Sequence, residues 1–472
     1  MIERGVAPSA EPYSPLRRTA LVLSGTGTAG AYHAGVLRAL HEAGVKLDIV
    51  AGRGAGVIGA LFAAVDGAPR LWDERGLWRA PSARTFYPWR RSLRALWLAL
   101  IIAVAIVALP LAAVALGLIV FPIDFVLKMV GLSGAGSLVS GYLRIAERLF
   151  APDGLPTWLP RLAVLVLGGA AIGALAAGYR RATARTRRGN FWWRLMSSPT
   201  TSTQAVDLTW SALWDLVRGA AQLKEPSHQD LARRYTELLA DNLGQPGFRE
   251  LLIVVHDVDA GRDLVCALVA ESRRAGLVRR ATIEATEARR AEVLDLAGLG
   301  RDHLADAVAG ALTVPIVNEY HELQFAPEAY WRGERHRIGD RPGAIARLLD
   351  ELVDLGVEQV IVVSAAPESP GPHALGAARN DGRGRVGEWL QSSEAAALHD
   401  LIARARTNGP RVFPIQPAHN PVGPFDFDGG IDERSARRLT LAELMHRGYE
   451  DAYHQFVEPV VGASGDRVGQ AI

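Results

Sequence analysis

Short apolar runs alternate with amphipathic stretches along much of the chain, and this pattern predicts alternating strands and helices. The runs Ala20–Leu23, Asp48–Ala51 and Leu251–Val255 have the length of buried strands. Further strands are predicted at Leu264–Val269, Gln359–Val363 and Val412–Ile415, and helices at Asp207–Ala221, Arg301–Leu312, Gly343–Leu355 and Leu441–Phe456. Such alternation is typical of a mainly parallel sheet covered by helices on both faces, so the sequence predicts an α/β fold.

Two uncharged apolar segments interrupt this pattern. The first runs from Ala95 to Ile123 and the second from Leu162 to Tyr179. A bilayer core needs about 20 apolar residues in a helix, so the two segments predict a hairpin of transmembrane helices at about 95–121 and 160–179. Pro110 lies in the middle of the first and predicts a kink. The alternative is a pair of helices buried in a soluble core.

The flanks of the two segments favour the membrane. Arginines lie outside the predicted hairpin on both sides, and aromatic residues lie near the expected interfaces. These residues are Arg90, Arg91, Arg94, Arg180, Arg181, Arg185, Arg187 and Arg188, with Trp89, Trp97, Trp158 and Tyr179. Because positive charge stays on the cytoplasmic side, we expect two spans in a bacterial cytoplasmic membrane, with the main domain in the cytoplasm.

Composition narrows the function further. A formal net charge of +2 lacks the basic surplus of a nucleic-acid-binding protein. The mean hydropathy of +0.10 is high for a soluble protein. The single cysteine, Cys266, excludes an internal disulfide and is expected in a buried strand. The stretch Met1–Leu16 has no apolar core, so no signal peptide is expected there.

A glycine-rich turn and a second glycine motif follow the first two predicted strands. The turn comprises Ser24–Gly30, and a helix is expected after it. The second motif is Gly52-Arg53-Gly54-Ala55-Gly56, which lies between a strand and a helix. This is the layout of a nucleophile elbow, G-x-S-x-G. The central residue is Gly54, however, and glycine has no atom that attacks an ester.

These motifs resemble those of patatin-like phospholipases, which carry a glycine-rich oxyanion loop ahead of a G-x-S-x-G elbow. The resemblance covers Arg18–Gly67 and, more weakly, Leu251–Ser364. It implies a three-layer α/β fold and lipid acyl hydrolysis by a serine–aspartate dyad. The matching oxyanion-loop residues are Gly25, Thr26, Gly27, Thr28, Ala29 and Gly30, and the matching elbow residues are Gly52, Arg53, Gly54, Ala55 and Gly56.

The resemblance also implies where the dyad aspartate belongs, in a D-G-[GA] motif ahead of a helix and a strand. The stretch Asp306–Val317 matches the segment before that motif, which places Arg332 at the aspartate position. An arginine there would favour a pocket for an anionic head group rather than for a neutral ester. The alternative reading is that Arg332 points to solvent or pairs with a nearby acid such as Glu334. The alternative is Asp428, which stands in a literal Asp-Gly-Gly but has no strand after it.

The same residues offer two other candidate sites. A hydroxyl of Ser24, Thr26 or Thr28 is a candidate for a relocated nucleophile. Gly25, Gly27 and Gly30 also fit G-x-G-x-x-G, but the second strand ends without the acidic residue of a nucleotide site. We expect no cofactor. We expect no metal either, because His303, His321 and His336 are scattered and Asp257 and Asp259 suit a strand end and a turn.

The sequence therefore predicts a membrane-anchored, patatin-like protein of lipid metabolism that is catalytically inactive and binds lipid or acyl groups or acts as a scaffold. The alternative is an active lipid acyl hydrolase with a non-standard nucleophile or dyad. Expected partners are membrane lipids and a protein partner or a second copy, without nucleic acid. The predicted parts are a tail (1–17), a first patatin-like part (18–88), a membrane insert (89–190), a second patatin-like part (191–416) and a C-terminal extension (417–472).

Overall fold

The computed structural model describes residues 13–131, 136–151, 155–182, 198–368, 379 and 381–461. The chain divides into two compact units, one made of Met1–Pro88 with Thr201–Ile472 and the other of Trp89–Thr200. Arg185, Arg187 and Arg188 of the second predicted arginine cluster lie outside the described residues, as does most of the predicted tail.

The larger unit is built on one sheet, which has nine strands within the described residues. Seven of them follow the order β5-β4-β3-β2-β1-β8-β9. Their bounds are β1 Thr19–Gly25, β2 Ile49–Gly54, β3 Glu250–Asp257, β4 Arg262–Leu268, β5 Val293–Asp295, β8 Gln359–Ser364 and β9 Arg411–Ile415. β1, β2, β3, β8 and β9 are mutually parallel. β4 runs antiparallel to β3, and the hairpin of β6 (His321–Gln324) and β7 (Arg335–Gly339) joins the end of β3.

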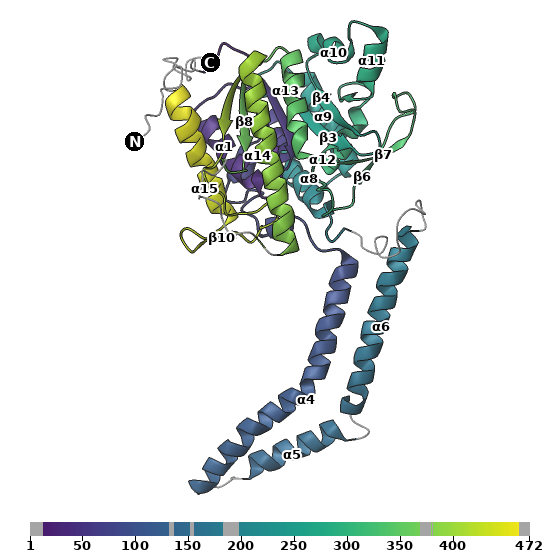
Figure 1. Cartoon of the computed structure of the whole chain (residues 1–472), viewed down its shortest axis with the longest axis vertical. Coiled ribbons are helices and arrows are strands. Elements are labelled where there is room, and N and C mark those ends of the chain that lie inside the picture. The colour runs from purple at the N-terminus through teal and green to yellow at the C-terminus, as the bar shows by residue number, and fades with distance from the viewer. Residues whose placement is uncertain are drawn as a thin grey trace. The chain divides into compact units, whose positions relative to one another are not determined.

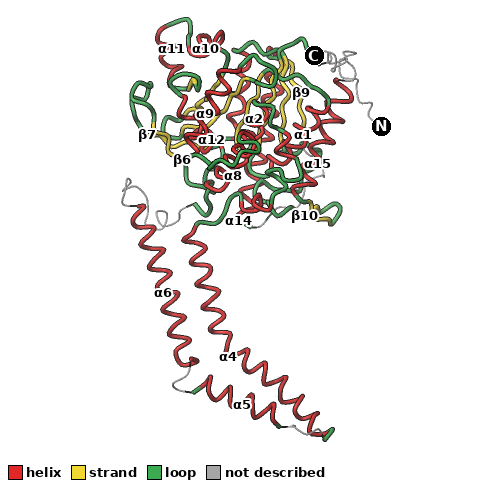
Figure 2. The backbone as a smooth tube through the Cα atoms, turned by 180° about the vertical axis from the view of Figure 1, so that it is seen from behind, coloured by secondary structure: helices red, strands yellow, loops and turns green. Residues whose placement is uncertain are grey.

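Each central strand contributes side chains to both faces of the sheet, because successive side chains point to opposite sides. On one face, Leu21, Leu23 and Val50 belong to a large core with α1 (Ala29–Glu42) and α2 (Gly56–Ala64). On the other, strand side chains such as Val22 pack in a second core. That core includes α13 (Ile345–Asp354) and α14 (Gly382–Asn408). Figures 1 and 2 show the strands between the two helical layers.

The remaining elements complete these layers. α15 (Leu441–Ala452) packs against α1. The other helices of this unit are α3 Pro69–Trp72, α8 Thr203–Val217, α9 His228–Asn242, α10 Glu271–Val278, α11 Ile283–Arg290 and α12 Leu304–Ala311, with a π-helical segment at Tyr453–Val461. A small two-stranded sheet joins β10 (Gly430–Asp432) to β11 (Arg437–Leu439). The predicted α/β class with a mainly parallel sheet is confirmed.

The smaller unit is helical. It contains α4 (Arg91–Met129), α5 (Ser137–Phe150) and α6 (Leu155–Ala182), and α4 packs against both of the others. Figure 1 shows α4 bent about halfway along its length. Pro110 lies at that level of the sequence and lacks the N–H that would bond to the preceding turn.

One described helix is long and apolar enough to cross a membrane, by length and composition only: α4 over Leu111–Met129. The apolar part of α6, Pro160–Ala176, is shorter than such a span. The two-span hairpin is therefore not established, and the spanning stretch lies nearer the end of α4 than the expected 95–121. Only 11% of that stretch is buried, so it is not a core helix of this unit.

Candidate functional site

The glycine-rich turn and the elbow motif meet at the carboxyl edge of the sheet. β1 and β2 are parallel neighbours, and Gly25 lies opposite Gly54 in their register. β1 leads into α1 and β2 leads into α2, so both helix N-termini begin at this edge. The structure thus brings together the two motifs that the sequence singled out.

Gly54 has the backbone of a nucleophile elbow. Its φ is +55°, in the left-handed region that side chains avoid, and α2 begins two residues later. A Cβ placed on Gly54 would lie 2.3 Å from the carbonyl oxygen of Gly25 and 3.0 Å from Oδ2 of Asp340. The turn is retained, but backbone occupies the place of the nucleophile.

Asp340 supplies the carboxylate beside the elbow, which corrects the expected placement of Arg332. Asp340 directly follows β7, whereas Arg332 is exposed in the turn before β7 and has a φ of +42°. β7 has five residues. At about 3.3 Å per residue it separates the two positions by about 16 Å. Arg332 lines a different hollow, with Tyr330 and Trp331.

Asp428 does not supply a carboxylate to the elbow either. Its side chain is exposed, in a turn directly before β10. The adjacent Phe427 is buried and would touch a Cβ placed on Gly27. The C-terminal extension therefore reaches the glycine loop with backbone and aromatic groups, and the Asp-Gly-Gly itself is a turn.

Arg53 fills the space beside the elbow. Its side chain is fully buried, and it donates from Nη1 to both carboxylate oxygens of Asp340 at 2.7 and 2.8 Å. Nη2 donates to Glu394 at 2.8 Å and Nε donates to the Ser24 hydroxyl at 2.9 Å. Asp340 and Glu394 are themselves 2% and 5% exposed. Both carboxylates next to the elbow are thus held by one guanidinium.

Three hydroxyl groups extend this buried cluster. Thr26 donates to Oδ2 of Asp340 at 3.0 Å, and Ser364 donates to Glu394 at 2.6 Å. Ser24 accepts from Arg53, as described above. Each comes from the carboxyl end of a central strand or from the loop after it. We call Ser24, Thr26, Arg53, Asp340, Ser364 and Glu394 the elbow cluster.

The charges in the elbow cluster favour a permanently ionised arginine. Burial by itself would lower the pKa of Arg53, but the carboxylates of Asp340 and Glu394 raise it overall. Both carboxyl groups face the same guanidinium, Asp340 through Nη1 and Glu394 through Nη2. The N-termini of α1 and α2 lie at the same edge, and helix N-termini stabilise negative charge.

His33 lies beneath the cluster as a neutral side chain. Its Nε2 lies 2.9 Å from the Ser24 carbonyl oxygen and therefore donates to it, and its Nδ1 has no hydrogen-bond partner. Complete burial, together with the nearby charge of Arg53, lowers the pKa of His33 to about 4, against the hydrogen bond to Ser24, which raises it. His33 points to a backbone carbonyl and not to a hydroxyl, so it is not placed as a general base.

Two backbone donors near the elbow are occupied by carbonyl groups of the chain. The N–H that follows the elbow position, on Ala55, donates to the Gly25 carbonyl at 2.7 Å. In the glycine loop, the N–H of Thr28 donates to the Pro424 carbonyl at 3.0 Å. The Thr28 hydroxyl donates to the neighbouring Gly423 carbonyl at 2.9 Å. An ester would have to displace these acceptors before either N–H could stabilise its oxyanion.

The sequence carried only part of the information for this site. Asp340 could have been found from its order in the chain, directly before the predicted helix and strand that follow the family's aspartate. Its neighbours, Arg341 and Pro342, hide it from a search for Asp-Gly-Gly. Glu394 comes from α14 and meets Arg53 only in the fold. Among the described residues, no group of three or more His, Cys, Asp or Glu side chains is placed to hold a metal ion.

Comparison with known proteins matches this part of the fold to one family. The family model described as patatin-like phospholipase matches residues 21–107. A comparison with curated proteins gives no match. The crystal structure of VipD from Legionella pneumophila is similar at 13% sequence identity and a TM-score of 0.29, over 94% of this chain and 67% of that one, and adds no argument at that level. The resemblance inferred from the glycine loop and the elbow is confirmed over residues 21–107, where the chain matches the patatin-like phospholipase family model.

Proposed function

We propose that this patatin-like protein is catalytically inactive. The proposal rests on the absence of a nucleophilic side chain at the elbow and on the pairing of the nearby carboxylate with an arginine. Gly54 offers no nucleophile, and Asp340, which we infer to be the dyad aspartate, is bound by Arg53. Both oxygens of that carboxylate accept from Nη1 of Arg53, so they are already occupied by the guanidinium.

The proposal is tested with purified full-length protein and short acyl esters. We expect no turnover above a buffer control and no labelling by a serine-directed fluorophosphonate probe. Wild-type turnover that is lost in Arg53→Lys or Asp340→Asn would contradict the proposal, because it would show that the elbow cluster performs chemistry. Asp428→Asn is the matched control, since that carboxylate is exposed and away from the elbow.

A second candidate is an acyl hydrolase that uses Thr26 as its nucleophile. It is favoured by one observation, the 3.0 Å hydrogen bond from the Thr26 hydroxyl to Asp340. A hydroxyl that donates to a buried carboxylate has the geometry of a nucleophile and its base. Thr26→Ala and Thr28→Ala separate the candidates, because only the first should abolish activity if Thr26 attacks.

We further propose that the protein is anchored in a membrane and acts there as a scaffold. Large apolar side chains are exposed along α4, among them Leu111 at 70% and Leu118 at 74%. Water would penalise such a surface, whereas lipid would cover it. The occupied donors at the elbow favour a scaffold over a binder of acyl groups in the remnant site.

A further inference from the structure

The glycine loop is covered by a segment that is distant in sequence. We call Pro421–Phe427 the strap. The strap has neither helix nor strand, and most of its residues are buried. A Cβ placed on Gly27 would lie 1.9 Å from the Pro424 carbonyl oxygen, so the two backbones are in direct contact. Gly27 thus allows an approach that another residue would prevent.

Two hydrogen bonds join the strap to the start of α1. Thr28 donates from its backbone N–H to Pro424 and from its hydroxyl to Gly423. The N–H belongs to the first turn of a helix, where backbone donors lack partners within the helix. The strap carbonyl therefore occupies a donor that an acceptor from outside the chain would need.

One carboxylate holds the strap in its turn. Asp426 accepts from the Gly423 N–H at 2.9 Å and from Arg379 at 2.5 Å. Arg379 also donates to the Pro421 carbonyl at 2.8 Å, so it reaches both ends of the strap. Asp428, two residues later, is exposed.

Aromatic rings seal the strap from the other side. Phe427 stacks on Phe86 with ring centroids 5.2 Å apart, and Tyr87 meets the edges of Phe425 and Phe427. Phe86, Phe425 and Phe427 are all nearly buried. These apolar contacts act together with the polar anchors in holding the strap in its turn.

We propose that the strap is a releasable cover of the remnant lipid site, fastened by Asp426 and by Thr28. The remnant character of the site rests on the proposed function, but the cover does not depend on the absence of turnover. Release of the strap uncovers the Thr28 amide and the glycine loop. It also withdraws Val422 and Phe427 from the edge of the first core, while the strands of the sheet stay paired.

Hydrogen–deuterium exchange of the full-length protein tests this inference. In Asp426→Asn, we expect the amide of Thr28 to exchange about tenfold faster than in the wild type, together with the strap amides, while β1 and β8 are unchanged. Asp428→Asn is the matched control and should exchange like the wild type. Thr28→Val, which removes the bond to Gly423 but keeps the side-chain shape, tests the same contact if Asp426→Asn does not fold.

The outcomes separate cleanly. Faster exchange of the strap without faster exchange at residue 28 would overturn the inference, because the strap would then not cover the loop. The same follows if Asp428→Asn matches Asp426→Asn, or if both Asp426→Asn and Thr28→Val exchange like the wild type. Esterase activity that appears in Asp426→Asn would refute catalytic inactivity but would support the cover.

Discussion

At the scale of single residues, the elbow has the backbone of a nucleophile site but lacks the nucleophilic side chain. The positive φ of Gly54 and the carboxylate of Asp340 remain where a nucleophile and its partner would need them. The serine is absent, and Arg53 donates hydrogen bonds to the carboxylate. The positive charge expected near the elbow is present, but it comes from Arg53 and is paired rather than open to an anion.

Restoring the serine tests how far the site has closed. We expect Gly54→Ser to give no esterase activity. A side chain in the left-handed region costs about 1–2 kcal/mol. The loss of stability should exceed this strain, because the new Cβ would also clash with the carbonyl oxygen of Gly25. Urea unfolding measures the loss. Gly54→Ala should match it, and Gly219→Ala isolates the strain, since Gly219 has a φ of +56° and open space around it. Activity in Gly54→Ser would contradict this expectation, because it would show that the glycine loop can move to accommodate the side chain.

His33 makes stability depend on pH. Its folded pKa of about 4 lies below the ordinary 6.5, so between these values the unfolded chain binds a proton that the folded chain does not. Stability therefore falls as pH falls through this window, by up to about 3 kcal/mol for a shift of this size. Thermal unfolding should show a flatter pH profile in His33→Gln than in the wild type. The exposed His41, changed to Gln, serves as the control.

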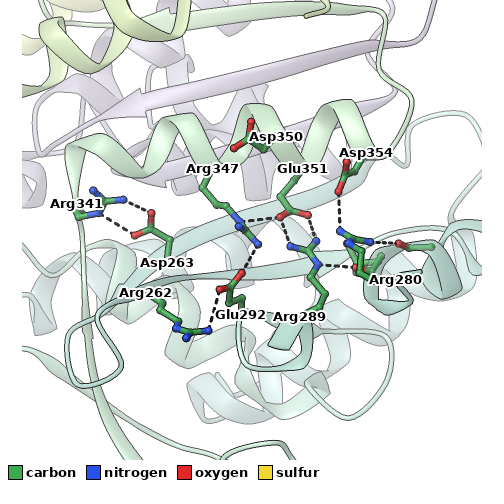
Figure 3. Close-up of polar contacts among 12 residues, drawn as sticks. Arg262, Asp263, Arg280, Arg289, Glu292, Arg341, Arg347, Asp350, Glu351 and Asp354 are labelled. Carbon is green, nitrogen blue, oxygen red and sulfur yellow. Dashed lines mark hydrogen bonds and ion pairs between the residues drawn. The ribbon is translucent and has the colours of Figure 1, made fainter. Parts of the chain in front are cut away.

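At the scale of elements, a network of ion pairs ties α13 to α11 and to β4 (Figure 3). Arg289 of α11 is 6% exposed and forms a bidentate pair with Glu351 of α13. Glu351 also forms an ion pair with Arg347. At the rim, Arg280 pairs with Asp354. The buried pair links α11 to α13, whereas the rim pair is exposed to solvent.

Removing the buried partner should cost far more than removing the exposed one. We expect Glu351→Gln to lower the free energy of unfolding by about 3–5 kcal/mol, because it leaves Arg289 buried without a countercharge. Asp354→Asn should cost less than about 1 kcal/mol, since its carboxylate is 53% exposed. Denaturant titrations measure both. Equal losses would indicate that the buried pair adds nothing beyond a surface contact.

The sequence predicted the strands and helices better than it predicted the side-chain contacts between them. The apolar runs gave the central strands because a strand buried on both faces needs a continuous apolar sequence. The end of β2 was placed at Ala51, yet β2 continues to Gly54 because its ladder with β1 includes the glycines. Arg53 and Glu394 could not be paired in advance, since they come from β2 and α14, which the sequence does not connect.

At the scale of the whole molecule, the two units differ in how much apolar helix surface they expose. The larger unit has its own cores on both faces of the sheet and should fold without the insert. The smaller unit exposes apolar side chains on two of its helices. Met129 of α4 is 75% exposed and Val164 of α6 is 69% exposed. Among the described residues, the smaller unit has the long apolar helix surface that our proposed membrane anchor would bury in lipid.

This difference predicts the behaviour of the chain in cell fractions. We expect the full-length protein to pellet with membranes and to resist carbonate extraction, because Leu111–Met129 is long and apolar enough to span. Deleting Leu93–Arg181 should move the protein to the soluble fraction without loss of its cooperative unfolding, since both cores lie outside the deletion. Replacing Leu111 and Leu118 with arginine in the full-length protein should weaken extraction resistance without altering the larger unit. Recovery of the unmodified chain in the soluble fraction after gentle lysis would refute the anchor, and the exposed apolar surface of α4 would then have to be covered by protein.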